Sequence, residues 1–232
     1  MATIKTWLTD FRDVLSPRFC ATCGEKLNTT EQKICGACLI RLPYLSKKDF
    51  LDNEVSRLFW AKIPIERGHS YIYYHKEGLT HELFMKMKYG HRPDLCRWIG
   101  LMMARDLIPR HFFEGIEAIV PVPLHWLRLI ERGYNQSYHI SKGLSEVSGI
   151  PVLNSCVKRI RNNETQTHKT ATERINNVKD VFQARSCIPA HHILLVDDVT
   201  TTGATLYSLA QSILKENRDM VFSVLTVGKA AD

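Results

Sequence analysis

The feature that most constrains the fold is a strand-like run that ends in two acids. Residues 193–196 are four consecutive aliphatic residues, which predict a buried strand. Asp197 and Asp198 follow directly, then a small hydroxyl-rich loop with Gly203, and then a helix predicted over residues 204–216. Adjacent carboxylates at the end of an apolar strand repel each other and resist burial, so we expect a ligand to compensate them.

The loop between this strand and the helix has the composition of an anion-binding site. A helix N-terminus offers unpaired N–H groups and a partial positive charge. Gly203 lets the backbone approach a ligand closely, and threonine hydroxyls add hydrogen-bond donors. The two acids suit sugar hydroxyls or the water shell of Mg²⁺. A phosphorylated sugar with free hydroxyls satisfies both halves of this segment.

From about residue 68 onward, the chain alternates segments that have the patterns of strands and helices. Aliphatic or aromatic runs bounded by turn residues predict strands, and apolar residues at three- and four-residue spacing predict helices. The predicted strands cover residues 68–75, 117–124, 150–153, 192–198 and 220–228, and the predicted helices cover 79–88, 95–107, 134–148 and 204–216. This alternation predicts an α/β domain with a mostly parallel sheet.

Four cysteines near the N-terminus follow the pattern C-x2-C-x11-C-x2-C. Each C-x2-C pair can point two thiolates at one ion, and two pairs complete the tetrahedral shell of structural zinc. An iron–sulfur cluster also takes four cysteines, free thiols are a third reading, and two disulfides would require an oxidising compartment. A closed site of this kind leaves no open position for catalysis. The predicted zinc ligands are Cys20, Cys23, Cys35 and Cys38.

These patterns divide the chain into two predicted parts. Residues 1–48 would form an amphipathic helix, with its apolar positions between Ile4 and Leu15, and a small zinc-ribbon-like module. Residues 49–232 would form the α/β domain. Zinc binding would supply the folding free energy that so small a module cannot obtain from a hydrophobic core.

Charge and hydropathy indicate which partner and which compartment to expect for the protein. Lys and Arg number 31 against 24 Asp and Glu, a formal net charge of +7, which suits a phosphate-rich partner such as a nucleotide or nucleic acid. No apolar run approaches the ~20 residues of a membrane span, and no signal peptide is visible. We expect a cytoplasmic protein without a transmembrane segment, and the N-terminal helix leaves a peripheral place at the inner membrane open. The oligomeric state stays undetermined.

The segment ILLVDDVTTTGAT, residues 193–205, resembles the phosphoribosyl pyrophosphate (PRPP) signature of type I phosphoribosyltransferases without a gap. More of the chain resembles one branch of that fold, the ComF family of competence-related proteins, and the matching motifs are collinear. These motifs are the double C-x2-C, FMKMKYG (84–90), PVPLHWLRLIERGYNQS (121–137), RIRNNETQ (159–166) and ERINN (173–177). Asn163 and Lys169 depart from the family pattern.

The resemblance implies a type I phosphoribosyltransferase-like domain and a role for each motif. Asp197 and Asp198 would hold the ribose hydroxyls, and Arg132 would face the pyrophosphate unless it is a solvated helix residue. Residues 158–178 would form a flexible loop over the site, with a plain solvated loop as the alternative. The implied PRPP-binding residues are Val199, Thr200, Thr201, Thr202, Gly203, Ala204 and Thr205, of which residues 201–205 would bind the 5′-phosphate, and Val122, Pro123 and Leu124 at the pyrophosphate. The implied loop residues are Arg159, Arg161, Gln166 and Arg174.

Two functions follow from the resemblance, and both stay open at this point. The first is Mg²⁺-dependent transfer of phosphoribose to an acceptor with release of pyrophosphate. The second is a non-catalytic protein that binds single-stranded DNA and works with DNA-uptake proteins in natural transformation, because an arginine-bearing loop suits backbone contacts. No acceptor pocket is visible by pattern, and the cysteine module is one candidate for the element that covers it.

Overall fold

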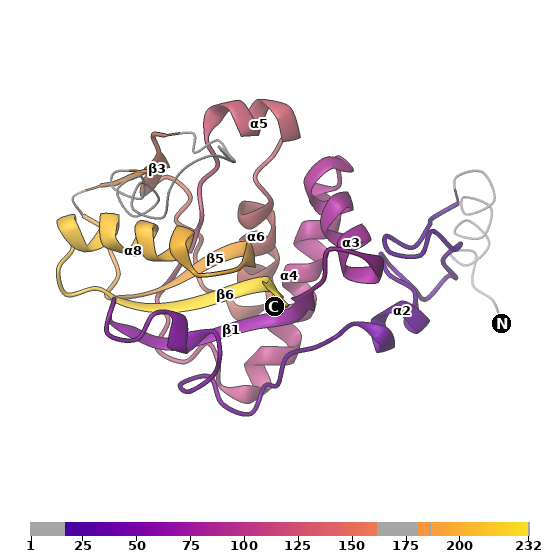
Figure 1. Cartoon of the computed structure of the whole chain (residues 1–232), viewed down its shortest axis with the longest axis horizontal. Helices are drawn as coiled ribbons and strands as arrows, with labels where there is room; N and C mark the ends of the chain where they lie inside the picture. The colour runs from indigo at the N-terminus through magenta and orange to yellow at the C-terminus, as the bar shows by residue number, and fades with distance from the viewer. Residues whose placement is uncertain (1–16, 162–180, 186, 232) are drawn as a thin grey trace.

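The computed structural model describes residues 17–161, 181–185 and 187–231 (Figure 1). Three sequence predictions lie outside these residues, namely the N-terminal amphipathic helix and the loop positions Gln166 and Arg174. The start of the predicted flexible loop, with Arg159 and Arg161, lies inside them.

The centre of the fold is a four-stranded parallel sheet with the strand order β1-β6-β5-β2. β5 (His192–Thr200) and β6 (Val221–Ala230) are the inner strands, and β1 (Ile65–Tyr74) and β2 (Ala118–Pro121) are the outer strands. The predicted α/β class with a mostly parallel sheet is confirmed. Because the strands run in the same direction, their carboxyl ends gather at one edge of the sheet, where ligands bind in folds of this kind. We call this edge the carboxyl edge.

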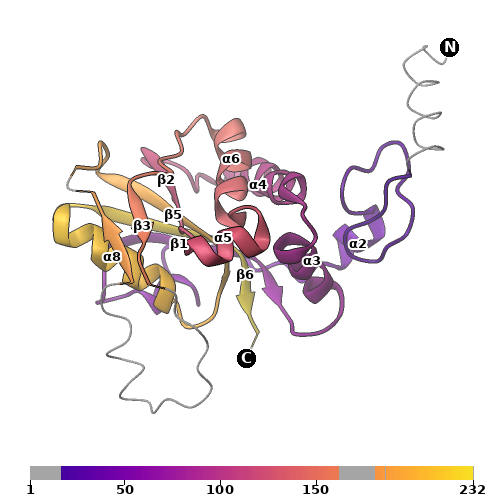
Figure 2. The same cartoon turned by 90° about the horizontal axis from the view of Figure 1, so that it is seen from above.

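Helices cover both faces of the sheet (Figures 1 and 2). α3 (Gly78–Tyr89), α4 (Pro93–Leu107) and α6 (Gln136–Ser148) pack on one face, and α8 (Ala204–Glu216) packs on the other. The four aliphatic residues 193–196 of β5 alternate between these two cores and are fully buried, as a strand covered on both faces requires. No helix in the described ranges is both long enough and apolar enough to cross a bilayer.

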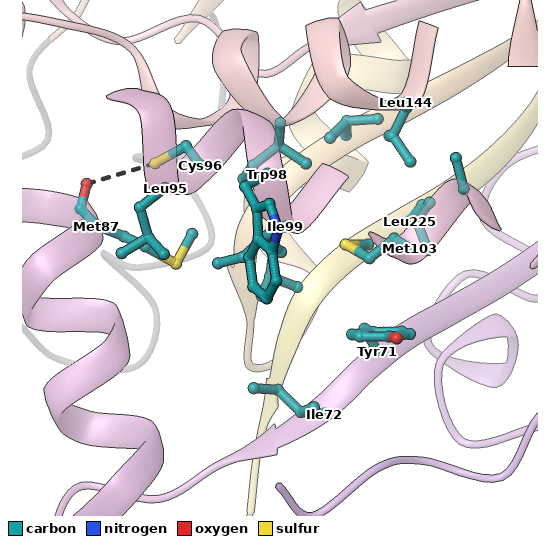
Figure 3. Close-up of a cluster of buried hydrophobic side chains, with 14 of the residues drawn as sticks. Tyr71, Ile72, Met87, Leu95, Cys96, Trp98, Ile99, Met103, Leu144 and Leu225 are labelled. Atoms are coloured by element: carbon teal, nitrogen blue, oxygen red, sulfur yellow. Dashed lines mark hydrogen bonds between the residues drawn. The ribbon is translucent and has the colours of Figure 1, made fainter. Parts of the chain in front are cut away.

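Helices α4 and α6 cross at very close range. Trp98 fills the core beside this crossing (Figure 3). A Cβ atom added at Gly143 of α6 would lie 2.0 Å from the carbonyl oxygen of Arg97, and one added at Gly100 of α4 would lie 2.1 Å from that of Ile140. Both contacts are to backbone atoms, which cannot rotate away as a side chain can. Glycine at these two positions therefore sets the distance between the helices.

We expect Gly143→Ala to destabilise the fold by about 1–3 kcal/mol or more, because the two helices must move apart to admit one methyl group. The measurement is the midpoint of urea unfolding. Lys142→Ala is the matched control, because Lys142 is exposed on the same helix and surface changes alter stability by about 0.5 kcal/mol or less. Equal midpoints for the two variants would contradict the close crossing.

Two parts of the fold differ from the sequence predictions. The strand predicted at residues 150–153 is reduced to one bridge between Val152 and Ile119. Pro151 has no N–H group, so it contributes only its carbonyl oxygen to the pairing. The second difference is an antiparallel hairpin of β3 (Val157–Arg159) and β4 (Phe182–Ala184), where a polar loop was predicted from residue 158.

The cysteine module stands at one end of the molecule, and α3 lies between it and β5 (Figures 1 and 2). It contains the short helix α2 (Gly36–Arg41), and Ile34 and Leu42 join the same hydrophobic core as α4. The Lys33 ammonium forms an ion pair with Asp94 of α4. Because module and domain share a core, the division at residue 48 stays a prediction.

The remaining elements are short. Two 3-10 turns, η1 (Ser56–Leu58) and η2 (Ile108–Arg110), flank β1 and α4, and α5 (Trp126–Arg132) connects the end of β2 to α6. Helix α5 was not predicted, because its large apolar residues do not face a core: Trp126 is 60% exposed and Ile130 is 73% exposed. Periodicity reveals a helix only when one face is buried.

Candidate functional site

The two acids lie at the carboxyl edge and are held by neighbouring elements. Asp197 Oδ1 accepts hydrogen bonds from Ser137 Oγ at 3.0 Å and from the backbone N–H of Asp198 at 2.9 Å. Asp198 is only 9% exposed, and its Oδ1 accepts from the N–H of Val199 at 2.7 Å. Its Oδ2 lies 3.5 Å from the ammonium nitrogen of Lys88 on α3. The fold thus compensates the pair in part, with hydrogen bonds to both acids and the Lys88 ammonium beside Asp198.

Asp197 keeps an unfavourable electrostatic position. Burial and the adjacent charge of Asp198 raise the pKa of Asp197 to about 7, although the Ser137 hydrogen bond and the Lys88 charge oppose this. A carboxyl group with a pKa near neutrality gains from any ligand that donates hydrogen bonds or positive charge to it. This is the behaviour expected of acids that meet sugar hydroxyls or a hydrated cation.

The loop after β5 leads into the N-terminus of α8. Thr200 is buried, and Thr201 and Thr202 are exposed at two consecutive bends. Gly203 caps the helix with a left-handed backbone, φ 75°, and no side chain caps the helix. A Cβ atom at Gly203 would lie 2.9 Å from the ring of Phe59. Both this contact and the positive φ favour glycine at this position. Ala204 and Thr205 are exposed in the first turn.

The predicted pyrophosphate loop, Val122 to Leu124, lies between β2 and α5 beside the acids. The N–H of Val122 donates to the carbonyl oxygen of Val196, the residue before Asp197, at 2.8 Å. Asn135 Nδ2 donates to the carbonyl oxygen of Val122 at 3.0 Å, and Asn135 Oδ1 accepts from the N–H of Ser137 at 3.0 Å. Asn135 therefore joins the turn to the N-terminus of α6. Pro123 and Leu124 are partly exposed.

Arg132 ends α5 as a buried cation. Its Nη1 donates to Gln136 Oε1 at 3.0 Å, and its guanidinium carbon lies 5.4 Å from the ring centroid of Tyr89. Arg132 Nε and Gln136 Nε2 are buried, and neither has a hydrogen-bond partner. Buried N–H donors are normally paired, so these two donors call for partners that the described residues do not supply.

The β3–β4 hairpin brings a second arginine to the site. Burial lowers the pKa of Arg159, the charges of Arg128 and Arg132 lower it further, and the charge of Asp197 acts in the opposite direction. Arg159 and Asp197 therefore act on each other electrostatically, while Arg161 is an exposed residue that follows β3.

Sequence reasoning missed two contacts of the acids, one from Lys88 and one from Ser137. Ser137 was quoted as the last residue of a motif without a role, yet its hydroxyl is the side-chain donor to Asp197. Its place in the first turn of α6, after the capping residue Asn135, is the only local signal. That the turn faces Asp197 depends on the packing of α6 against β5.

The four predicted zinc ligands converge in the N-terminal module. Their Sγ atoms all lie within 4.8 Å of one another, and those of Cys23 and Cys35 are 3.8 Å apart. Zn–S bonds of ≈ 2.3 Å in a tetrahedron place sulfur atoms about 3.8 Å apart. The cluster could therefore hold a structural metal such as zinc.

Local hydrogen bonds favour the thiolate at one of the four cysteines, Cys20, whereas burial raises the pKa of the Cys38 thiol to about 12. Although burial opposes the shift, hydrogen bonds from Thr22, Cys23 and Cys35 lower the pKa of the Cys20 thiol to about 6. Glu31 accepts from the N–H groups of Asn28 at 2.9 Å and Gly36 at 2.7 Å and so fixes the connection between the two cysteine pairs. A thiolate is the form that binds metal.

The sequence of the chain is similar to those of known proteins. Competence protein F from Haemophilus influenzae is 32% identical over 210 residues, which are 88% of this chain and 82% of that protein. The chain belongs to the ComF family. Competence protein ComFC from Bacillus subtilis is 32% identical over 109 residues, which are 47% of this chain and 43% of that protein. DNA utilization protein YhgH from Escherichia coli K12 is 29% identical over 136 residues, which are 57% of this chain and 60% of that protein.

Two further comparisons complete this picture. No protein-family model matches the chain. Among solved structures, glutamine PRPP amidotransferase from B. subtilis, complexed with ADP and GMP, is similar with a TM-score of 0.38 and 17% identity, over 62% of this chain and 30% of that one. A similarity of this extent carries no argument about function. Membership of the ComF family, which the sequence motifs predicted, is confirmed by the relatives in sequence.

Proposed function

We propose that this ComF protein binds PRPP, or a closely related phosphorylated ribose, at the carboxyl edge of β5. The observation that carries the proposal is the meeting of three unlike groups at one edge: the acidic pair, the uncapped N-terminus of α8, and Arg132 with its unpaired buried Nε. Acids suit hydroxyls, a helix N-terminus suits a phosphate, and a buried guanidinium suits a second phosphate group. A sugar with hydroxyls and phosphates at both ends meets all three.

Each part of the ligand has a matching part of the site. The backbone N–H groups and hydroxyls of residues 200–205 would bind the 5′-phosphate. Asp197 and Asp198 would accept hydrogen bonds from the ribose hydroxyls, which relieves the repulsion between the two acids. The turn from Val122 to Leu124, with Arg132 and Arg159, would face the pyrophosphate.

The donor set at this edge also fits Mg²⁺. Carboxylate oxygens are the protein ligands that Mg²⁺ prefers, and Asp197 and Asp198 supply them beside the proposed pyrophosphate position. When bound, Mg²⁺ would neutralise charge on the pyrophosphate. The chain's own contribution is to hold the sugar between the acids and the phosphate loop and to fold Arg159 over it.

The finer proposal is that the bound sugar is transferred. The C1–O bond to pyrophosphate breaks, pyrophosphate leaves with the electron pair, and a nitrogen of the acceptor forms the new bond to C1 and gives its proton to water. The sugar becomes cationic between these events, and nearby carboxylates stabilise that charge. The acids are thus suited both to binding and to the transition state.

Calorimetric titration of the protein with PRPP in the presence of Mg²⁺ tests the binding proposal. We expect saturable binding with one site per chain. An acceptor screen that detects released pyrophosphate then separates the two readings: release that depends on an added acceptor supports transfer, while binding without release supports a regulatory ligand. A chain that binds neither PRPP nor ribose 5-phosphate would contradict the proposal.

A second candidate function is binding of single-stranded DNA. It is favoured by Arg159 of β3, on which the charge of Arg128 acts, by the exposed Arg161 that follows β3, and by the names of relatives as competence and DNA utilization proteins. No base-reading motif is visible, so phosphate contacts would dominate. Such binding weakens with salt, with a log–log slope of roughly −0.7 per phosphate contacted.

We expect Arg159→Ala with Arg161→Ala to weaken DNA binding for all sequences alike and to flatten its salt dependence. The measurement is fluorescence anisotropy of a labelled oligonucleotide across a salt series. Arg105→Ala with Arg218→Ala is the matched control, because it removes the same charge from exposed positions outside the hairpin. If Arg159 also closes over PRPP, then PRPP and DNA must weaken each other's binding by the same factor. No binding at low salt would exclude direct DNA handling.

A further inference from the structure

The last turn of α3 contacts two parts of the proposed ligand site. Lys88 Nζ lies 3.5 Å from Asp198 Oδ2, and the guanidinium carbon of Arg132 lies 5.4 Å from the ring centroid of Tyr89. One helical turn therefore touches both the acidic pair and the buried arginine. The binding of PRPP proposed above gives no role to Lys88 or Tyr89, although both belong to the motif FMKMKYG of residues 84–90.

This end of α3 is held by a hydroxyl from the connection between α5 and α6. The last four carbonyl groups of a helix have no partner within the helix. The carbonyl oxygen of Met87 is one of them, because α3 ends at Tyr89, and it accepts a hydrogen bond from Tyr134 Oη at 2.6 Å. The thiol of Cys96 approaches the same oxygen at 3.8 Å (dashed line in Figure 3). Tyr134 thus fixes the turn that carries Lys88.

The same hydroxyl also accepts a hydrogen bond from the start of α4. Tyr134 is only 8% exposed, and its Oη accepts from the backbone N–H of Arg92 at 3.2 Å. The guanidinium of Arg92 donates to both carboxylate oxygens of Asp94, with Nε to Oδ1 at 2.9 Å and Nη2 to Oδ2 at 3.1 Å. Two bonds of this kind fix the relative geometry of the two groups. The Tyr134 hydroxyl therefore connects the end of α3 to the start of α4.

Asp94 also faces the cysteine module. Its carboxylate forms an ion pair with the Lys33 ammonium. Burial favours the neutral acid, but hydrogen bonds from Arg92 and Lys33 outweigh it and lower the pKa of Asp94, which is therefore a carboxylate between two cations. Lys33 stands two residues before Cys35, and its carbonyl oxygen accepts at 2.9 Å from the N–H of Ala21, which lies inside the first cysteine pair. The position of Lys33 thus depends on both cysteine pairs.

The cysteine module supplies the element that can change state. Metal decides whether small cysteine modules of this kind are folded. The ion pair to α4 is half-exposed, with 28% of the Lys33 side chain and 45% of the Asp94 side chain accessible, so by itself it contributes little. Ile34 and Leu42, however, belong to the same core as α4. Loss of the metal would therefore remove the ion pair and these apolar contacts together.

We infer that Tyr134 is a positioning residue that couples the metal-bound state of the cysteine module to the PRPP site through the last turn of α3. This inference rests on the proposed function, because the coupled ligand is PRPP at the acidic pair. With metal bound, the module holds Asp94, Asp94 holds the start of α4, and the Tyr134 hydroxyl holds the end of α3 beside the acids. Two sites coupled in this way act on each other equally, so PRPP must raise the affinity for zinc by the factor by which zinc raises the affinity for PRPP.

Competition for zinc between the full chain and a zinc-selective chelator measures this coupling. The zinc-loaded protein is titrated with the chelator in the presence of Mg²⁺, once without PRPP and once with saturating PRPP. We expect PRPP to raise the zinc affinity by about fivefold or more, which is the lower end of typical couplings between two sites. We call this ratio of zinc affinities the coupling factor.

Tyr134→Phe removes the hydroxyl and keeps the buried ring, so the variant should fold, bind zinc and bind PRPP. Its coupling factor is expected to fall toward one, because the bond to the Met87 carbonyl is lost. A purely structural role of Tyr134 would lower stability and leave the coupling factor unchanged. Tyr138→Phe is the matched control, since it removes the same atom from a half-buried tyrosine of α6 whose ring lies beside Lys142. It should keep the coupling factor of the unmodified chain.

Asp94→Asn tests the module end of the same connection. Asp94 is exposed, so the variant should fold, and its loss of charge weakens the contacts to Lys33 and Arg92. We expect a coupling factor about two- to fivefold lower than in the unmodified chain, a limited step because half-exposed ion pairs contribute little. Glu146→Gln is the control, since it removes a carboxylate from a different ion pair of α4, the one with Arg97.

The outcomes separate the two proposals. If PRPP binds but the zinc affinity is equal with and without it, the coupling is overturned and the PRPP site stands. If folded Tyr134→Phe keeps the full coupling factor, the role assigned to its hydroxyl is overturned. If PRPP does not bind at all, the proposed function falls and this inference falls with it.

Discussion

Purified protein is expected to contain one zinc ion per chain, and Cys35→Ser is expected to unfold the cysteine module. The Sγ atoms of the four cysteines already lie within 4.8 Å of one another, so a tetrahedral ion needs little rearrangement. Structural zinc contributes on the order of 10 kcal/mol to the folding of small modules, far more than any single side chain. Metal analysis by mass spectrometry gives the stoichiometry, and thermal unfolding with and without a chelator gives the stability.

The control for this prediction is Cys187→Ser. Cys187 is an exposed thiol outside the four-cysteine cluster, so its loss should change neither zinc content nor stability. Because Ile34 and Leu42 belong to the core that also contains α4, loss of the metal should lower the unfolding temperature of the whole chain as well. If the protein contains iron and sulfide, the site holds an iron–sulfur cluster and the zinc assignment is wrong. If the metal-free chain is as stable as the purified protein, the metal has no structural role.

Asp197→Asn with Asp198→Asn is expected to lower PRPP affinity by about 10- to 100-fold or more. The double change keeps the shape of both side chains but removes the charge, and each charge-assisted hydrogen bond contributes ~1.5–3 kcal/mol. It also removes the burial of charge and the repulsion from Asp198, which together raise the pKa of Asp197 to about 7, so the folded variant should be at least as stable as the original chain. Calorimetry on the folded double variant measures the affinity.

The matched control is Asp219→Asn with Glu114→Gln, which neutralises two exposed acids away from the carboxyl edge. It should leave PRPP affinity unchanged within about twofold. A double variant at Asp197 and Asp198 that binds PRPP as tightly as the control would mean that the acids do not touch the ribose. If the double variant is more stable than the original chain but binds PRPP more weakly, the two acids serve binding at a cost in folding stability.

What could be predicted from the sequence was local. The run 193–196 gave a buried strand, and the helix predicted over residues 204–216 has the bounds that α8 has in the structure. Both follow from short-range effects, aliphatic periodicity and a glycine with φ 75° before the helix. The cysteine spacing likewise indicated a cluster, because knuckles of two cysteines are closed within a few residues.

The sequence by itself determined the chemistry of the β5–α8 loop, the cysteine cluster and the α/β class. Only the tertiary structure decided which distant residues act on one another: Ser137 and Lys88 at the acids, Arg159 on Asp197 through its charge, and Glu54 beside Lys229. These contacts have no local pattern, because each side chain is polar and brings no periodicity, and its partner lies on another strand or helix. The parallel register likewise aligns Thr200, Lys229 and Tyr73 in one row only after the sheet has formed.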